Sequence, residues 1–225
     1  MSSTTQNVGG FAPAFTEHFV QADGLRIRYL EAGQGSPVVV LHSNEGLTQS
    51  PLHTLLARHF RVIALEIPGF DQSSKDAQPS KMRAAAHTLA RALVSLGLEH
   101  YVLVSISTST LLTLWQAIAV PECVDALVLI SPTASGFTND SELERKLGEI
   151  QVPTLILIGT NDTTSPPETG RFYVERLPNC FYTLVYDAGH AIVAERPEAL
   201  LAAVCDFVER RGTFIVERNS TAINP

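Results

Sequence analysis

Runs of consecutive apolar residues recur along this chain, and helical patterns separate most of them. Strands that are apolar on both faces are typical of a parallel sheet that is covered by helices on both sides. A chain that alternates such strands with helices therefore favours an α/β fold over an all-α or an all-β fold. The runs are Val38–Leu41, Val62–Leu65, Val102–Ser105, Ala126–Ile130, Thr154–Ile158 and Phe181–Val185.

The antiparallel signal lies near the start of the chain, where Asp23-Gly24 separates two strand-like runs, His18–Ala22 and Leu25–Glu31. Asp-Gly favours the type I′ turn of a tight hairpin, because both residues tolerate positive φ. Helices are predicted by apolar spacing and by terminal signals, among them Gly97 as a C-cap and a proline in the first turn of the last helix. The predicted helices are Met82–Leu96, Leu111–Ala119, Ser141–Ile150, Pro167–Leu177 and Pro197–Arg210.

This order of elements predicts a doubly wound, mostly parallel eight-stranded sheet with helices on both faces. The length of 225 residues fits a single domain over residues 1–225. Its core is expected at about residues 18–211, after an N-terminal extension over 1–17. Residues 212–225 are expected to form a C-terminal tail, in which Thr213–Val216 could add a short strand.

Composition narrows the class of function. The net charge is −7, with 16 basic against 23 acidic residues, which argues against a nucleic-acid partner or an anionic membrane surface. The apolar runs are too short to span a bilayer, and the N-terminus lacks the basic and apolar regions of a signal peptide. Cys123, Cys180 and Cys205 match no disulfide framework and no zinc motif. We therefore expect a cytoplasmic protein with reduced thiols.

A buried strand runs into a polar turn and a helix at Tyr101–Thr110. Ser107 stands at this junction, with Ser105 and Ser109 two positions away on either side. Small residues at those positions suit a nucleophile elbow, a sharp turn that brings strand and helix close together. Serine and threonine also commonly cap helices, and from this segment alone that interpretation stays open.

Two more candidates follow later strands. Asp162 lies after the run that ends in Gly159, where an Asx-turn is the ordinary alternative. His190 follows Gly189 after the last apolar run, where a surface histidine is the alternative. Asp187 is closer to His190 in sequence than Asp162, but it is expected at the strand end, pointing elsewhere. Loops at the carboxyl ends of parallel strands are where the functional sites of such sheets collect.

Taken together, these segments resemble the α/β-hydrolase fold family, in which a catalytic triad follows the chain order Ser, acid, His. The resemblance extends from about Phe19 to Arg211, and several weak motifs in the right order make it specific. Further segments that resemble the family are His42-Ser43-Asn44, Ile67-Pro68-Gly69-Phe70, Val152-Pro153-Thr154-Leu155, Gly189-His190 and Glu195-Arg196-Pro197-Glu198.

The sequence departs from the family pattern at several places. The usual Gly-x-Ser-x-Gly is here Ser105-Ile106-Ser107-Thr108-Ser109. If either replaced glycine position required positive φ, a residue with a Cβ would be destabilising there by about 1–2 kcal/mol. Ser43, Glu66 and Asp71 also replace more usual residues. Only Ser131–Gln151 stands where many relatives insert a helical cap, so a minimal cap and an open site are expected, unless the tail or a second subunit covers it.

The resemblance implies a serine hydrolase of a small acyl substrate, either an ester, a thioester or a related compound. Ser107 would be the nucleophile, His190 the general base and Asp162 the acid that orients it. The backbone N–H groups of Asn44 and Thr108 would form the oxyanion hole. The residues around Asn44 that could line the substrate pocket are His42, Ser43 and Glu45. For His42 the resemblance favours the alternative of a structural residue that fixes the oxyanion loop by hydrogen bonds.

No metal or organic cofactor is expected, and the partner is a small-molecule substrate rather than a nucleic acid or a membrane. A homodimer stays open, because a second subunit is one way to cover the site. The alternative function is a hydrolase-like binding or signalling protein that is catalytically weak or inactive, which the replaced glycines favour. The intact Ser107, Asp162 and His190 favour the enzyme.

Overall fold

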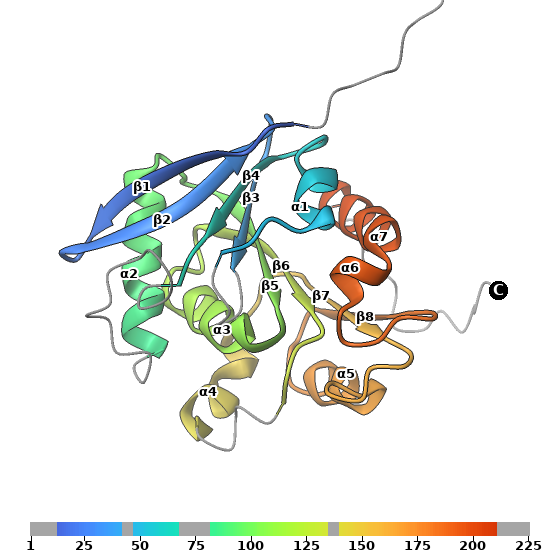
Figure 1. The fold of residues 1–225 in the computed structure, drawn as a ribbon. Coiled ribbons are helices and arrows are strands. Elements are labelled where there is room, and N and C mark those ends of the chain that lie inside the picture. The colour runs from blue at the N-terminus through green and yellow to red at the C-terminus, as the bar shows by residue number, and fades with distance from the viewer. Residues whose placement is uncertain (1–12, 42–46, 68–81, 135–139, 211–225) are drawn as a thin grey trace, which may run out of the picture.

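The computed structural model describes residues 13–41, 47–67, 82–134 and 140–210. Its centre is an eight-stranded sheet with the strand order β1-β2-β4-β3-β5-β6-β7-β8 (Figure 1). The strands are β1 Thr16–Ala22, β2 Leu25–Ala32, β3 Pro37–Leu41, β4 Arg61–Leu65, β5 Tyr101–Ile106, β6 Val124–Ile130, β7 Thr154–Gly159 and β8 Cys180–Val185.

The predicted hairpin is confirmed. β1 and β2 pair antiparallel around Asp23 and Gly24, whose φ angles of 50° and 76° are the positive values that a type I′ turn requires. β2 is also antiparallel to β4, while every other pairing in the sheet is parallel. The sheet is therefore mostly parallel, as the apolar runs predicted.

Helices cover both faces of the sheet (Figure 1). Buried residues of α2, α3, α4 and α5 pack on one face. Those of α1, α6 and α7 pack on the other face. The helices are α1 Pro51–Leu56, α2 Met82–Ser95, α3 Thr110–Ala119, α4 Ser141–Lys146, α5 Pro167–Val174, α6 Ile192–Glu195 and α7 Pro197–Glu209.

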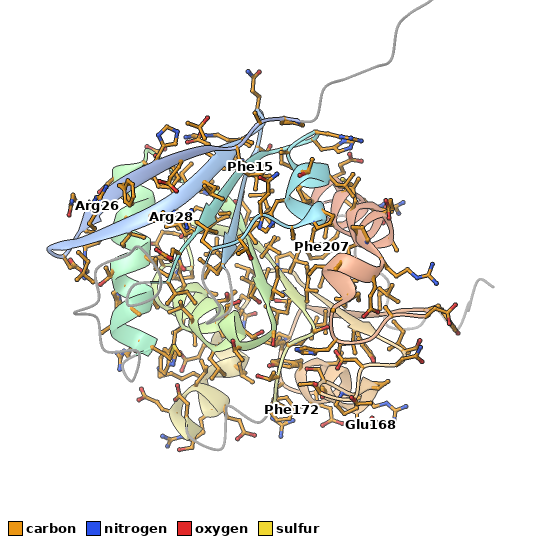
Figure 2. The ribbon with its side chains drawn as sticks, in the orientation of Figure 1. Phe15, Arg26, Arg28, Glu168, Phe172 and Phe207 are labelled. Carbon is orange, nitrogen blue, oxygen red and sulfur yellow. The ribbon has the colours of Figure 1, made fainter. Side chains whose placement is uncertain are left out.

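The alternation of side chains along a strand divides the core into two layers. In β3, Val39 and Leu41 belong to the layer under α2 and α3, whereas Val38 and Val40 belong to the layer under α1 and α7. Phe207 of α7, labelled in Figure 2, is one of these core side chains. Its ring packs edge-on against that of Phe181 of β8, with the ring centroids 6.0 Å apart. The predicted doubly wound sheet is confirmed. Its inner strands β3, β4, β5, β6 and β7 are mostly apolar because both of their faces are buried, whereas β1, β2 and β8 carry exposed or polar residues.

Local differences from the sequence prediction have local causes. The predicted helix Ser141–Ile150 divides into α4 and a 3-10 turn, Leu147–Glu149, which contains the helix-weakening Gly148. α6 is only four residues long and was not located from sequence. The predicted strand Thr213–Val216 and the terminal extensions lie outside the described residues, so the division into one domain with two extensions stays a prediction. In the part of the chain that the structure describes, no helix has the length and apolar character needed to cross a membrane.

Candidate active site

Ser107, Asp162 and His190 lie together at the carboxyl edge of the sheet. Ser107 follows β5, Asp162 follows β7 and His190 follows β8. Ser107 Oγ is 3.0 Å from His190 Nε2, and His190 Nδ1 is 2.9 Å from Asp162 Oδ2. Parallel strands end at the same edge, so residues 83 and 28 positions apart in sequence meet there.

The turn that carries Ser107 has the backbone of a nucleophile elbow. β5 ends at Ile106, a 3-10 turn covers Ser107–Ser109, and α3 begins at Thr110. Ser107 has φ 54°, a conformation that is destabilising for a residue with a Cβ by roughly 1–3 kcal/mol and persists only where the surroundings hold it. Its side chain is half-buried and that of Thr108 is exposed, so the tip of the turn faces outward.

The strain lies at Ser107 itself and not at the two replaced glycine positions. Within the described residues, the non-glycine residues with positive φ are Asp23, Ser107, Ser131 and Asp187. Ser109 has φ −69°, and Ser105 continues β5. The departure from Gly-x-Ser-x-Gly therefore adds no backbone strain at Ser105 or Ser109.

Asp162 combines the Asx-turn with a contact to the imidazole. Its side chain is completely buried. Oδ1 accepts hydrogen bonds from Thr164 N at 2.9 Å and Ser165 N at 2.7 Å, which fixes the loop. A carboxylate offers only acceptors, so the facing Nδ1 of His190 must carry a proton. In a neutral imidazole Nε2 is then an acceptor, directed at the Ser107 hydroxyl.

The loop that carries His190 is held from three sides. Gly189 N donates to Glu195 Oε2 at 2.6 Å. Asn161 N donates to Ala188 O at 2.9 Å, and Asp187 N donates to Thr160 Oγ1 at 3.1 Å. Sequence reasoning assigned no role to Glu195, although an acidic residue six positions after Gly189 was the available signal. These hydrogen bonds hold the backbone that leads into His190, while Asp162 contacts the ring itself.

Asp187 points away from the imidazole. Its side chain is 81% exposed and forms an ion pair with Arg196 Nη2 at 3.2 Å. Of the two acidic residues considered from the sequence, Asp162 is the one in contact with His190.

Gly159, at the end of β7, lies directly against the His190 loop. A Cβ at this position would be 2.2 Å from Ala188 O and 2.7 Å from Gly189 O, so the loop would have to move. We expect Gly159→Ala to lower the free energy of unfolding by about 1–3 kcal/mol and to slow any reaction of Ser107. Thermal melts and labelling of Ser107 measure the two effects. Gly148→Ala is the matched control, because a Cβ there meets open space; equal effects of both changes would contradict this explanation.

Four of the residues named from sequence lie outside the described residues. They are His42, Ser43, Asn44 and Glu45, so the proposed oxyanion donor on Asn44 and the three pocket positions stay predictions. Thr108 lies within the structure, next to Ser107 in the elbow, where the N–H groups of a first turn have no partner inside the turn.

The cap is minimal in the part of the segment that can be described. Between β6 and β7, the described residues contain α4 and one 3-10 turn. Asp140 at the start of α4 accepts a hydrogen bond from Trp115 Nε1 at 2.7 Å, and Leu143 is buried in the layer that also contains α3. These contacts hold α4 beside α3.

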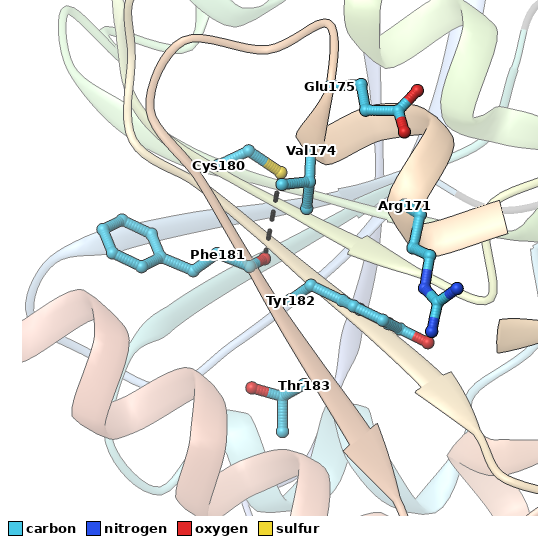
Figure 3. Close-up of a pocket in the computed structure, with 7 residues that line it drawn as sticks. All are labelled: Arg171, Val174, Glu175, Cys180, Phe181, Tyr182 and Thr183. Atoms are coloured by element: carbon cyan, nitrogen blue, oxygen red, sulfur yellow. Dashed lines mark hydrogen bonds between the residues drawn. The ribbon is translucent and has the colours of Figure 1, made fainter. Parts of the chain in front are cut away.

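A separate groove of about 530 Å³ lies between α5 and β8 (Figure 3). Ser107, Asp162 and His190 are not among its lining residues. It contains Cys180, but burial raises the pKa of that thiol to about 12, so it is protonated at neutral pH. The groove therefore offers no thiolate nucleophile that competes with the Ser107 site.

The chain is similar to known proteins over most of its length. Human ABHD14B, which carries the name of a candidate protein-lysine deacylase, is 25% identical over 205 positions, covering 86% of this chain and 95% of the relative. A hydrolase of Metapseudomonas resinovorans named for 2-hydroxy-6-oxo-6-(2'-aminophenyl)hexa-2,4-dienoic acid is 25% identical over 269 positions, covering 88% of this chain and 92% of the relative.

Structural comparison gives the same fold. The crystal structure of a serine hydrolase involved in carbazole degradation matches with a TM-score of 0.76 and 22% identity, covering 88% of this chain and all of the other. A family model described as the alpha/beta hydrolase fold matches residues 36–151, about half of the chain. The chain belongs to the α/β hydrolase fold family.

Proposed function

We propose that this protein is a serine hydrolase of acyl substrates, with Ser107 as nucleophile, His190 as general base and Asp162 as the acid that orients the ring. The observation that carries the proposal is the pair of contacts on one imidazole. Nε2 lies 3.0 Å from the Ser107 hydroxyl, and Nδ1 lies 2.9 Å from a fully buried carboxylate. A nucleophile within hydrogen-bond reach of a base that is oriented by a third group is the signature of an activated serine.

In the proposed reaction, His190 Nε2 takes the proton of Ser107 as Oγ attacks the substrate carbonyl. The imidazolium that forms is stabilised by the Asp162 carboxylate and then gives its proton to the leaving group. A water molecule, deprotonated by the same imidazole, then attacks the acyl carbon. The bond to Ser107 Oγ breaks, the imidazolium returns its proton to Oγ, and the carboxylic acid is released.

The tetrahedral intermediate needs donors for its oxyanion. The candidates are the backbone N–H of Thr108, next to Ser107, and that of Asn44, by resemblance to the family. One such donor is typically worth about 10²–10³ in rate. Both donors belong to the main chain of other residues, so serine in place of glycine at positions 105 and 109 does not remove them.

The names of the relatives suggest two substrate classes, a 2-hydroxy-6-oxo-hexadienoic acid and an acylated lysine of a protein. The alignment with the Metapseudomonas hydrolase is 269 positions long, more than the 225 residues of this chain, so that relative contains inserted segments. The alignment with human ABHD14B is 205 positions long and needs few insertions. This similarity in length, together with a half-buried Ser107, favours an open site for the acyl end of a larger molecule, including an acylated lysine. Small esters and thioesters remain the first candidates, since they fit a site of any depth.

Reaction with a fluorophosphonate tests the proposal directly. We expect labelling at Ser107, located by mass spectrometry of peptides, and loss of esterase activity in proportion. Iodoacetamide is the contrasting reagent, and it should leave activity intact, because burial raises the pKa of the Cys123, Cys180 and Cys205 thiols. A protein that neither labels nor hydrolyses a panel of short esters, thioesters and acetyl-lysine peptides would favour the alternative of a catalytically inactive binding protein.

A further inference from the structure

The Ser109 hydroxyl connects two strands at the base of the elbow. Ser109 is 1% exposed. Its Oγ accepts a hydrogen bond from Ile106 N at 3.0 Å and lies 2.9 Å from both Leu41 O and Ile106 O, to either of which it can donate. Leu41 is the last residue of β3 and is 68 positions away in sequence. One buried hydroxyl thus contacts the end of β3 and the end of β5.

This hydroxyl connects β3 and β5 just beyond the end of their pairing. The pairing of β3 with β5 ends at Leu41 and Ser105. Beyond that pair β5 turns into the elbow, and the next N–H, that of Ile106, is directed to Ser109 Oγ. A buried N–H and a buried carbonyl both need partners, and a serine hydroxyl can accept from one while it donates to the other. A glycine at 109 has no group that could do either.

A second hydroxyl acts on the other side of the turn. Thr110 Oγ1 donates to Ser107 O at 2.7 Å and lies 3.5 Å from Ser105 Oγ. The carbonyl of the strained residue is therefore held as well. A residue at φ 54° keeps that backbone angle only when neighbouring contacts hold it there. In this elbow the hydrogen bonds of the Ser109 and Thr110 hydroxyls are contacts of that kind.

We propose that the Ser109 hydroxyl is a positioning group that fixes the elbow to the end of β3 and so holds Ser107 at the distance and angle at which His190 can activate it. The inference rests on the proposed function, since it concerns the reactivity of Ser107. It also gives the departure from Gly-x-Ser-x-Gly a physical role: in this chain the serine contributes a bond that the family glycine cannot make. Restoring glycine is then expected to impair the site.

The test measures the rate of labelling by a fluorophosphonate at saturating concentration. Ser109→Ala and Ser109→Gly are expected to lower this rate roughly 10- to 100-fold, because small displacements of a nucleophile have effects of that order. The concentration of half-saturation and the position of the pH profile should stay unchanged, since Asp162 and His190 are not touched. Ser109→Cys, which keeps a weak donor and acceptor, should label at an intermediate rate.

Thr113→Val is the matched control, at a buried hydroxyl in α3, the helix that begins directly after Ser109. Thr113 is fully buried, and its hydroxyl has no hydrogen-bond partner within the residues that the structure describes. Its removal should leave labelling unchanged. Amide hydrogen exchange at Ile106 is the second readout and should accelerate in Ser109→Ala but not in Thr113→Val.

The outcomes separate the two proposals. Labelling of Ser109→Ala and Ser109→Gly within twofold of the wild type, or an equal loss in Thr113→Val, would overturn the positioning role. If Ser109→Ala does not fold, the labelling rate of Ser109→Cys is the deciding measurement. A labelling rate equal to that of the wild type would contradict the positioning role of Ser109. If the wild type itself is not labelled, the proposed function fails, while unchanged exchange at Ile106 would separately show that Ser109 does not hold the elbow.

Discussion

Replacing Ser107 by alanine is expected to abolish hydrolysis of a short-chain p-nitrophenyl ester. For enzymes of this type, removal of the nucleophile lowers kcat by a factor on the order of 10⁶, so the residual rate should be close to background. The fold should change little, because Ser107 is half-buried at the outer tip of the elbow. Steady-state kinetics and a thermal melt on the same preparation measure both effects.

Ser107→Gly separates the chemistry of this position from its backbone strain. The glycine also removes the nucleophile, so activity should be lost to the same extent. Glycine adopts φ 54° without the penalty that a Cβ brings, so the folded state is stabilised by about 1–2 kcal/mol relative to alanine. About half of this stabilisation is offset because glycine has greater conformational freedom in the unfolded chain. The midpoint of thermal unfolding should therefore rise by about 1–3 °C relative to Ser107→Ala.

Two results would contradict this account of Ser107. Esterase activity that survives in both variants would show that another residue is the nucleophile. A glycine variant less stable than the alanine variant would show that the elbow holds residue 107 without strain.

Asp162→Asn is expected to lower kcat by about 10⁴-fold with little change in KM. The amide can keep the two bonds from Thr164 N and Ser165 N through its oxygen, so the loop should hold its shape. Its NH₂ group would face Nδ1 of His190 as a donor, which favours the tautomer in which Nε2 carries the proton. That imidazole cannot accept the Ser107 proton. The measurement is the pH–rate profile together with the melting temperature.

Asp187→Asn is the matched control for this variant. Like Asp162, Asp187 is an acidic residue, and it lies closer to His190 in sequence. Its exposed carboxylate forms an ion pair with Arg196 instead of contacting the imidazole. An exposed ion pair contributes about 0–1 kcal/mol, so activity and stability should both stay close to the wild type. A large loss of activity in Asp187→Asn with a mild effect of Asp162→Asn would reverse the assignment of the acid.

Asp162→Ala should in addition destabilise the fold. It removes the acceptor of Ser165 N, which is buried, and leaves that group unsatisfied, at about 1–3 kcal/mol. The difference between the asparagine and alanine variants therefore separates the role of Asp162 in the loop from its role toward His190.

The sequence predicted the eight-stranded sheet because its signals are local and repeated. Three of these signals each depend on a few neighbouring residues, and the structure confirms them. They are the runs of consecutive apolar residues, the Asp23-Gly24 turn and the C-cap at Gly97. The order of strands and helices then leaves few topologies, since crossovers between parallel strands are right-handed. Helix ends were less predictable: the predicted helix Ser141–Ile150 divides after Lys146 into α4 and a 3-10 turn.

The candidate site was also named from the sequence, through the resemblance in motif order rather than through spacing alone. The structure brings Ser107, His190 and Asp162 into contact, while their catalytic roles stay a prediction that the variants above test. The bonds that support them could not be predicted. Ser109 to Leu41 spans 68 residues, and whether a small buried residue meets a carbonyl depends on how two strands end beside each other.

The sequence by itself determined which segments become strands and which strand ends carry reactive side chains, because hydrophobic periodicity and turn chemistry act within a few residues. The tertiary structure alone decided that the positive φ falls on Ser107 and not on the residues that replace the glycines. It also decided that Asp162 rather than Asp187 meets the imidazole, and that Glu195 holds the His190 loop. These outcomes depend on distances between groups far apart in the chain, which are fixed only when the sheet and its helices pack together.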